Sequence, residues 1–174
     1  ERWACRRLDA VVAATPFIRN KFAAIGAHTV DINNFPMLGE LSSGEVDWPQ
    51  KKNQVCYVGG IGRIRGILEV MQAMGMVSSG ARLQLVGKFG ESEVEAQAHQ
   101  SRGWLQVDAL GFQGRRDVAQ VLARSVAGLV TFLPAPNHID AQPNKMFEYM
   151  SAGVPVIASN FPLWREIIEG NDCG

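Results

Sequence analysis

The sequence predicts an α/β protein with a doubly wound, Rossmann-like parallel sheet. From residue 55 onward, short runs rich in valine and leucine alternate with helical patterns. This alternation is typical of βαβ units, whose strands run parallel. Glycines follow several of the apolar runs, as they do in loops that approach a phosphate closely. The length of 174 residues is enough for one well-packed domain and a piece of another.

The first 35 residues predict a strand, a helix and a second strand, over Leu8–Ala14, Pro16–Ile25 and His28–Ile32. Thr15 is a typical N-cap ahead of a first-turn proline, and Gly26 ends the helix. The chain that follows is rich in proline, glycine, serine and lysine. This composition predicts a linker over residues 36–52.

After the linker, strands and helices alternate. The expected strands are Val55–Val58, Leu83–Val86, Leu105–Leu110, Ala127–Leu133 and Val154–Ala158. The expected helices are Ile64–Val77, Glu91–Ser101, Asp117–Arg124, Pro143–Ala152 and Pro162–Glu169. Ligands of such sheets bind at the carboxyl ends of the strands, so we expect a site there.

A glycine-rich loop, Gly59-Gly60-Ile61-Gly62, follows the first of these strands and opens a helix. One interpretation is a dinucleotide fingerprint. Arg65 stands where the third glycine should be, and the next strand ends in Gly87-Lys88 where an acid should hold a ribose. A tight turn without a ligand is another interpretation.

The most informative segment is residues 142–159. Pro143 suits the first helical position, and Asn144 and Lys145 then lie among the free N–H groups of the first turn, where anions bind. Glu148 is the only carboxylate on this helix, and Gly153 ends it. An anion site with one acid about a turn further along suits a nucleotide diphosphate and its ribose.

This segment resembles a known family. Asp140 and Glu148 have seven residues between them, and Lys145–Ser159, followed by Trp164–Ile168, is similar to the donor-binding end of retaining glycosyltransferases with the GT-B fold, family four in particular. The resemblance is specific over residues 140–170 and looser over 55–135. It implies that residues 53–174 are the nucleotide-sugar donor-binding domain, the C-terminal half of a GT-B fold.

The resemblance also implies roles for single residues. The second acid of the motif, Glu148, would accept hydrogen bonds from ribose hydroxyls, and the first, Asp140, would contact the donor sugar. The family clamps the diphosphate with an arginine and a lysine; Gly60 stands at the arginine position and Arg65 at the lysine position. Arg65 can neutralise phosphate, and Arg63 on the same loop could compensate for the missing cation.

Other site residues have open alternatives. Gly59 belongs to the phosphate loop. Lys88 either meets phosphate or is solvated. Gly111 and Phe112 resemble the segment that holds the edge of the base, or Phe112 packs inward from a glycine turn. An alternative for Asp140 is that it caps the helix that follows, and Asn137 and His138 are candidates to share its role.

Composition excludes several classes of protein. The formal net charge is zero, so we expect no nucleic-acid partner, and no apolar run is long enough for a membrane span. The three cysteines are scattered and odd in number, which argues against a zinc site or a disulfide framework, and we expect no metal. A reducing cytoplasm fits this cysteine usage, with peripheral contact at the inner face of the membrane if the acceptor is lipid-linked.

We therefore expect a domain that binds a UDP- or GDP-sugar as substrate, without a cofactor, in an enzyme that transfers the sugar to a hydroxyl acceptor with retained configuration. Both ends of the chain look cut, the C-terminal end included. Residues 1–35 would be the tail of the acceptor-side domain or a crossover segment. With the N-terminal acceptor domain missing, the fragment alone would be inactive. Two alternatives are a nucleotide-sugar epimerase on the same fold, for which only His138 is suitably placed, and a non-catalytic nucleotide- or protein-binding module.

Overall fold

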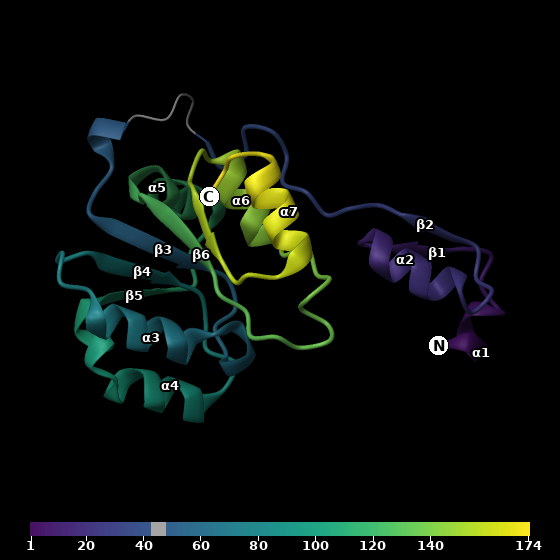
Figure 1. Cartoon of the computed structure of the whole chain (residues 1–174), viewed down its shortest axis with the longest axis horizontal. Coiled ribbons are helices and arrows are strands. Elements are labelled where there is room, and N and C mark those ends of the chain that lie inside the picture. The colour runs from purple at the N-terminus through teal and green to yellow at the C-terminus, as the bar shows by residue number, and fades with distance from the viewer. Residues whose placement is uncertain (43–47) are drawn as a thin grey trace.

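A computed structural model gives the fold of residues 1–42 and 48–174. A two-stranded parallel sheet near the N-terminus lies apart from a five-stranded parallel sheet, and an extended segment joins the two (Figure 1). Helices flank the larger sheet on both faces. The predicted α/β fold with a doubly wound parallel sheet is confirmed.

The order of the large sheet locates its ligand-binding edge. Strands β1 (Val11–Ala13) and β2 (Thr29–Asp31) form the small sheet; β3 (Gln54–Val58), β4 (Arg82–Val86), β5 (Val107–Gly111), β6 (Ala127–Val130) and β7 (Val156–Ala158) form the large one. The large sheet has the order β5-β4-β3-β6-β7. The chain builds outward from β3 in one direction and then returns to build from β6 in the other. Ligands of open α/β sheets bind at such a switch point, outside the carboxyl ends of the strands.

The helices divide between the two faces. They are α1 (Arg2–Cys5), α2 (Pro16–Ala23), α3 (Ile67–Met76), α4 (Ser92–Gln100), α5 (Arg115–Arg124), α6 (Asn144–Ser151) and α7 (Pro162–Gly170), with 3₁₀ turns at Trp48–Gln50, Arg63–Arg65 and Arg102–Gln106. Helices α3 and α4 cover one face of the large sheet, and α5, α6 and α7 the other (Figure 1). Among the described residues, no helix has both the length and the apolarity needed to cross a membrane.

Each face of the sheet has its own apolar core because side chains alternate along a strand. In β3, Cys56 and Val58 pack toward α5, α6 and α7, whereas Tyr57 packs toward α3 and α4. Nearly all of β3 is buried, as expected for a central parallel strand.

Most element boundaries differ from the sequence prediction by one to three residues. Gly66 adopts a left-handed conformation (φ 74°) that divides the expected helix 64–77 into a 3₁₀ turn and α3. A 3₁₀ turn occupies the start of the expected strand Leu105–Leu110, so β5 begins at Val107. Pro143 is extended (ψ 128°) and precedes α6, where it was expected inside the first turn. The short helix α1 was not predicted.

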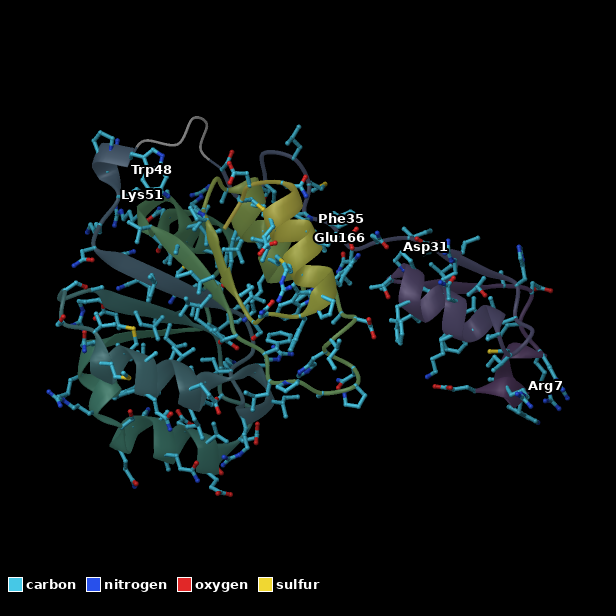
Figure 2. The ribbon with its side chains drawn as sticks, in the orientation of Figure 1. Arg7, Asp31, Phe35, Trp48, Lys51 and Glu166 are labelled. Atoms are coloured by element: carbon cyan, nitrogen blue, oxygen red, sulfur yellow. The ribbon has the colours of Figure 1, made fainter. Side chains whose placement is uncertain are left out.

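The expected linker, residues 36–52, is only partly described, because residues 43–47 lie outside the described part of the chain. Its first part packs against the larger unit. Leu41 is buried in the same core cluster as Tyr149 and Trp164. The ring of Phe35, just before the linker, meets that of Phe147 on α6 edge to face at 4.7 Å between centroids. Figure 2 shows Phe35 lying against the larger unit, far from Arg7.

Helix α6 is fixed to the sheet through Tyr149. The Tyr149 side chain is fully buried, and its hydroxyl accepts a hydrogen bond from the backbone N–H of Val58, at 2.9 Å. Its ring lies so close to Gly128 on β6 that a Cβ at position 128 would collide with it. The contact joins α6 to the last residue of β3, where the glycine-rich loop begins.

This contact predicts that Tyr149→Phe costs about 1–3 kcal/mol of unfolding free energy, because the buried N–H of Val58 loses its acceptor. Urea unfolding followed by circular dichroism measures the loss. Tyr57→Phe is the matched control: its hydroxyl bonds to the carbonyl of Gly60, which also accepts from Arg65 and therefore keeps a partner. Equal losses in the two variants would show that the Val58 bond does not fix α6.

Candidate functional site

Three glycines line the carboxyl edge of the sheet. Gly59, Gly87 and Gly111 lie at or just beyond the ends of β3, β4 and β5, each with a positive φ (118°, 142° and 67°). The N–H of Gly59 donates to the carbonyl of Val86 at 2.9 Å, and that of Gly87 donates to Gly111 at 2.8 Å. A Cβ at Gly87 would collide with the carbonyl of Gly59. The three loops therefore form one continuous backbone surface that a ligand can approach closely.

Arg65 covers the second glycine of the first loop. Its Nη1 donates to the carbonyl of Gly60 at 3.0 Å, and a Cβ at position 60 would collide with the guanidinium. Arg65 thus lies where a side chain at position 60 would begin. Arg63 turns away from the site: it bonds to Gln97 at 3.1 Å and pairs with Glu93 at 3.7 Å, both on α4. The idea that Arg63 compensates for the missing cation is wrong for this geometry.

Lys145 provides a cation from the other side of the loop. Its Nζ lies 3.5 Å from the centroid of the Tyr57 ring and 5.7 Å from that of Phe132. The side chain also touches the first loop, since a Cβ at Gly59 would lie 3.4 Å from the Lys145 Cε. Lys145 is only 7% exposed, and its Nζ has no hydrogen-bond partner in the structure.

A buried ammonium without a hydrogen-bond partner is costly. Burial and, to a smaller extent, the neighbouring Arg65 lower the pKa of Lys145 to about 7, against the opposite influence of Cys56 and Glu148. The aromatic rings offer only a cation–π contact, which does not replace three donated hydrogen bonds. Asn144 is exposed in the same first turn, and no side chain caps this end of α6.

Glu148, one turn further along α6, is held by Arg115. Nη1 of Arg115 lies 2.6 Å from Oε1 of Glu148, and its Nε lies 2.8 Å from Oε1 of Glu40. The Glu148 side chain is only 16% exposed. The ion pairs raise the pKa of Arg115, with the larger effect from Glu40, and lower that of Glu40. Sequence reasoning did not identify Arg115.

Phe112 and Lys88 lie together at the end of the sheet. Phe112 is 75% exposed, so the alternative that it packs inward is wrong. Nζ of Lys88 lies 5.8 Å from the centroid of its ring. An exposed aromatic ring beside a cation and the glycine of β5 is a surface on which a planar ring can stack.

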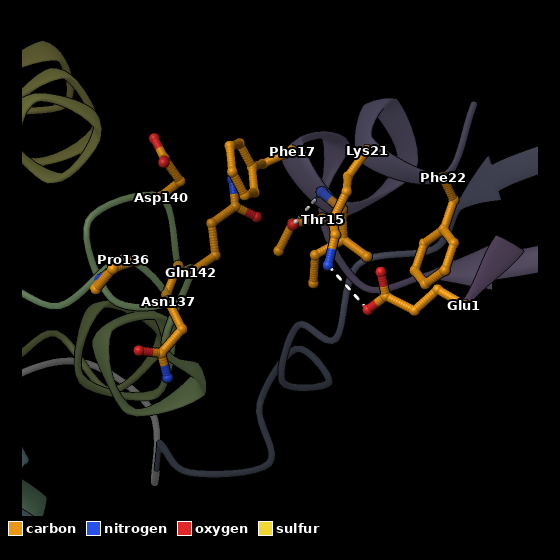
Figure 3. Close-up of a pocket in the computed structure, with 11 residues that line it drawn as sticks. Glu1, Thr15, Phe17, Lys21, Phe22, Pro136, Asn137, Asp140 and Gln142 are labelled. Carbon is orange, nitrogen blue, oxygen red and sulfur yellow. Dashed lines mark hydrogen bonds and ion pairs between the residues drawn. The ribbon is translucent and has the colours of Figure 1, made fainter. Parts of the chain in front are cut away.

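Asp140 belongs to a different part of the surface. It lies on the wall of a cavity of about 600 Å³ between the loop after β6 and α2. Figure 3 shows Asp140, Asn137 and Gln142 on one side of this cavity and Thr15, Phe17 and Lys21 on the other. No side chain caps α6, so the alternative that Asp140 is its cap is wrong.

His138 has a structural role. It is buried, its Nδ1 lies 3.0 Å from the carbonyl of Leu133, and its ring packs on Phe132 at 4.8 Å between centroids. The epimerase alternative therefore loses its one candidate histidine. In the part of the chain that the structure describes, no group of three His, Cys, Asp or Glu side chains could hold a metal ion.

Comparison with known proteins identifies the fold and the family. Similar solved structures include HepE of Anabaena in complex with UDP-glucose (TM-score 0.69, 19% identity, covering 90% of this chain and 46% of that one). They also include WaaG, a glycosyltransferase involved in lipopolysaccharide biosynthesis (0.68, 15%, 94% and 47%), and sucrose-phosphate synthase from Thermosynechococcus elongatus (0.68, 21%, 91% and 42%). The sheet and its helices match GT-B glycosyltransferase folds.

The chain spans less than half the length of each of these three proteins, at 46%, 47% and 42%. A search of curated proteins finds no match. Residues 52–174, most of the chain, match the family model of glycosyl transferases group 1. The chain therefore belongs to the group 1 glycosyl transferases.

Proposed function

We propose that residues 53–174 bind the nucleotide-sugar donor of a retaining glycosyltransferase, which transfers the sugar to a hydroxyl acceptor. The observation that carries this proposal is the buried Nζ of Lys145, which has no hydrogen-bond partner and lies beside the glycine loop after β3. A diphosphate placed there would supply the missing acceptors.

The diphosphate would lie between α6 and the glycine loop. Lys145 and Arg65 would face it from two sides, with the N-terminus of α6 and Asn144 at one end and the backbone of Gly59 and Gly60 beneath it. Gly60 lacks the arginine that the family carries at that position, and Lys145 supplies a cation next to the same loop. These groups would stabilise the charge that develops on the leaving diphosphate.

The nucleoside would extend from the diphosphate across the sheet edge. Glu148 would accept hydrogen bonds from the ribose hydroxyls. The base would lie against Gly111 and Phe112, with Lys88 on the other side of the aromatic ring. HepE binds UDP-glucose, which favours UDP-glucose as the first donor to test.

The sugar would point toward the cavity between the loop after β6 and α2. Asp140 lies on its wall and would bind sugar hydroxyls near the reacting carbon. Acceptor contacts would come from the N-terminal domain, of which residues 1–35 would be the last part. We propose that the enzyme acts in the cytoplasm, at the inner face of the membrane if its acceptor is lipid-linked.

Calorimetric titration of the 174-residue chain with UDP-glucose tests this proposal. We expect saturable binding that Glu148→Ala weakens about tenfold or more, because charged hydrogen bonds to the ribose are lost. Glu166→Ala, on the exposed side of α7, is the matched control and should bind like the unaltered chain. Two results would contradict the proposed donor site. One is an affinity for UDP-glucose that Glu148→Ala leaves unchanged; the other is no binding of UDP-, GDP- or ADP-glucose at millimolar concentration.

Lys145→Met separates stability from binding. The folded-state pKa of Lys145 is about 7, well below its unfolded value, so the unfolded chain binds more protons between pH 7 and 10 and stability should rise with pH across this window. Below pH 7 the cost of the buried charge is fully present. Methionine has a similar shape and no charge, so we expect Lys145→Met to stabilise the chain at pH 6.5 by on the order of 3 kcal/mol and to flatten the pH dependence.

The same variant should bind UDP-glucose at least about tenfold more weakly, because a charged contact with the diphosphate is lost. Urea unfolding at pH 6.5 and 9 gives the first result and calorimetry the second. Lys52→Met, whose side chain is exposed just before β3, is the control for both. A Lys145→Met variant that is less stable at both pH values would show that Lys145 is a packing residue.

A further inference from the structure

Arg115 joins two carboxylates from distant parts of the chain. One belongs to Glu148 on α6 and the other to Glu40 in the expected linker; they lie 2.6 Å from Nη1 and 2.8 Å from Nε of Arg115. The planar guanidinium holds both at once through different nitrogens, which a lysine cannot do in the same way. Arg115 thus links Glu148, the residue proposed to bind the ribose, to the segment that leads to the N-terminal sheet.

The position of Arg115 is unfavourable for its own helix. It is the first residue of α5, where the helix dipole favours anions over cations, and no side chain caps this end. The next residue, Arg116, is also exposed but makes no ion pair with a described residue. Two arginines in the same turn therefore differ in one respect: only Arg115 reaches the site.

The ion pair occupies one of the two carboxylate oxygens of Glu148 and leaves the other able to accept hydrogen bonds. Among the described residues, only Arg115 donates to the Glu148 carboxylate, and it uses Oε1. A carboxylate has about four acceptor positions, so Oε2 can still accept from hydroxyl groups. Because the Glu148 side chain is 16% exposed, few other groups can orient it. The contact with Arg115 sets the direction of the Glu148 carboxylate.

The other carboxylate belongs to a segment that is anchored around it. Phe35 packs on Phe147 of α6, and Leu41, next to Glu40, is buried in the core. Glu40 itself is held by Arg115. The segment from Phe35 to Leu41 thus rests on α6 and α5, and a shift of Arg115 toward or away from Glu148 changes the attraction between Arg115 and Glu40.

We propose that Arg115 is a positioning residue: it orients Glu148 for the ribose and couples occupation of the donor site to the hold on the segment Phe35–Leu41. This inference rests on the proposed function of Glu148. It goes beyond that function because Arg115 itself need not touch the donor. Ribose hydroxyls on Oε2 draw the Glu148 carboxylate into a fixed position, and Arg115, bound to both acids, becomes fixed with it.

A double-mutant cycle on the full 174-residue chain tests the positioning role. In calorimetric titrations with UDP-glucose, we expect Arg115→Ala to weaken binding about tenfold and Arg116→Ala to change it less than about twofold. Arg115→Ala combined with Glu148→Ala should bind no more weakly than Glu148→Ala alone. Arg115→Lys keeps the positive charge but not the planar guanidinium, so its affinity for UDP-glucose should lie between those of the unaltered chain and Arg115→Ala.

Hydrogen exchange tests the coupling. Saturating UDP-glucose should slow amide exchange in residues 35–42 of the unaltered chain, and Glu40→Gln and Arg115→Lys should reduce this effect. A change in folding alone would alter exchange with and without UDP-glucose equally. If UDP-glucose does not change the amide exchange rates of residues 35–42 in the unaltered chain, the proposed coupling is wrong.

The outcomes separate this inference from the proposed function. If Glu148→Ala weakens binding and Arg115→Ala does not, or if the two losses add, the positioning role is wrong while the donor site stands. If the unaltered chain binds no nucleotide sugar, the proposed function fails and this inference fails with it.

Discussion

The structure of the candidate site depends on how α6 is docked onto the sheet. Tyr149 accepts the N–H of Val58 and presses against Gly128, so the helix is fixed to β3 and β6 at the switch point of the strand order. From that position, Lys145 lies beside Tyr57 and the glycine loop, and Glu148 faces Arg115. One buried hydroxyl and one glycine thereby set the place of both charged groups that we assign to the donor.

The docked helix carries Lys145, whose charged form is poorly stabilised by the groups around it. The Lys145 ammonium is almost completely buried, lacks a hydrogen-bond partner and lies near a second cation, Arg65. Such an arrangement lowers stability in the absence of an anion and strengthens the attraction for one, since both effects come from the same exclusion of water. Binding groups that reduce stability are common at functional sites. The glycine at position 60 leaves room for the Arg65 guanidinium, with which a Cβ there would collide.

Local patterns predicted much of this architecture. The alternation of apolar runs gave all five strands of the large sheet, and Gly153 correctly marked the end of α6, where it adopts φ 65°. Boundaries were less certain: the conformation of Gly66 depends on its tight contact with Thr131, and the extended form of Pro143 on how the chain enters α6. A local sequence pattern of about ten residues predicts neither of these features.

The sequence named the candidate site residues, but it did not predict the contacts between them. The motif around residues 140–159 identified Lys145 and Glu148, but the burial of Lys145 depends on Tyr57, almost ninety residues earlier. Arg115 lies 33 residues from Glu148 and 75 from Glu40, so no spacing rule relates them. A cation at the first position of a helix was the one available signal, because the helix dipole disfavours it. For His138 the sequence suggested a site role that the structure does not support, because the side chain is buried and bonded to the backbone.

The central claim is that Lys145 binds the donor diphosphate as a buried cation. Calorimetry with UDP-glucose at pH 8, in two buffers of different ionisation enthalpy, measures the protons taken up on binding; the diphosphate diester itself does not titrate there. With a pKa of about 7 in the free chain, Lys145 is mostly neutral at pH 8 and must become charged against the diphosphate. We predict uptake of roughly one proton per UDP-glucose, and none in Lys145→Arg, which stays charged throughout. Binding with no proton uptake in the unaltered chain would contradict the account.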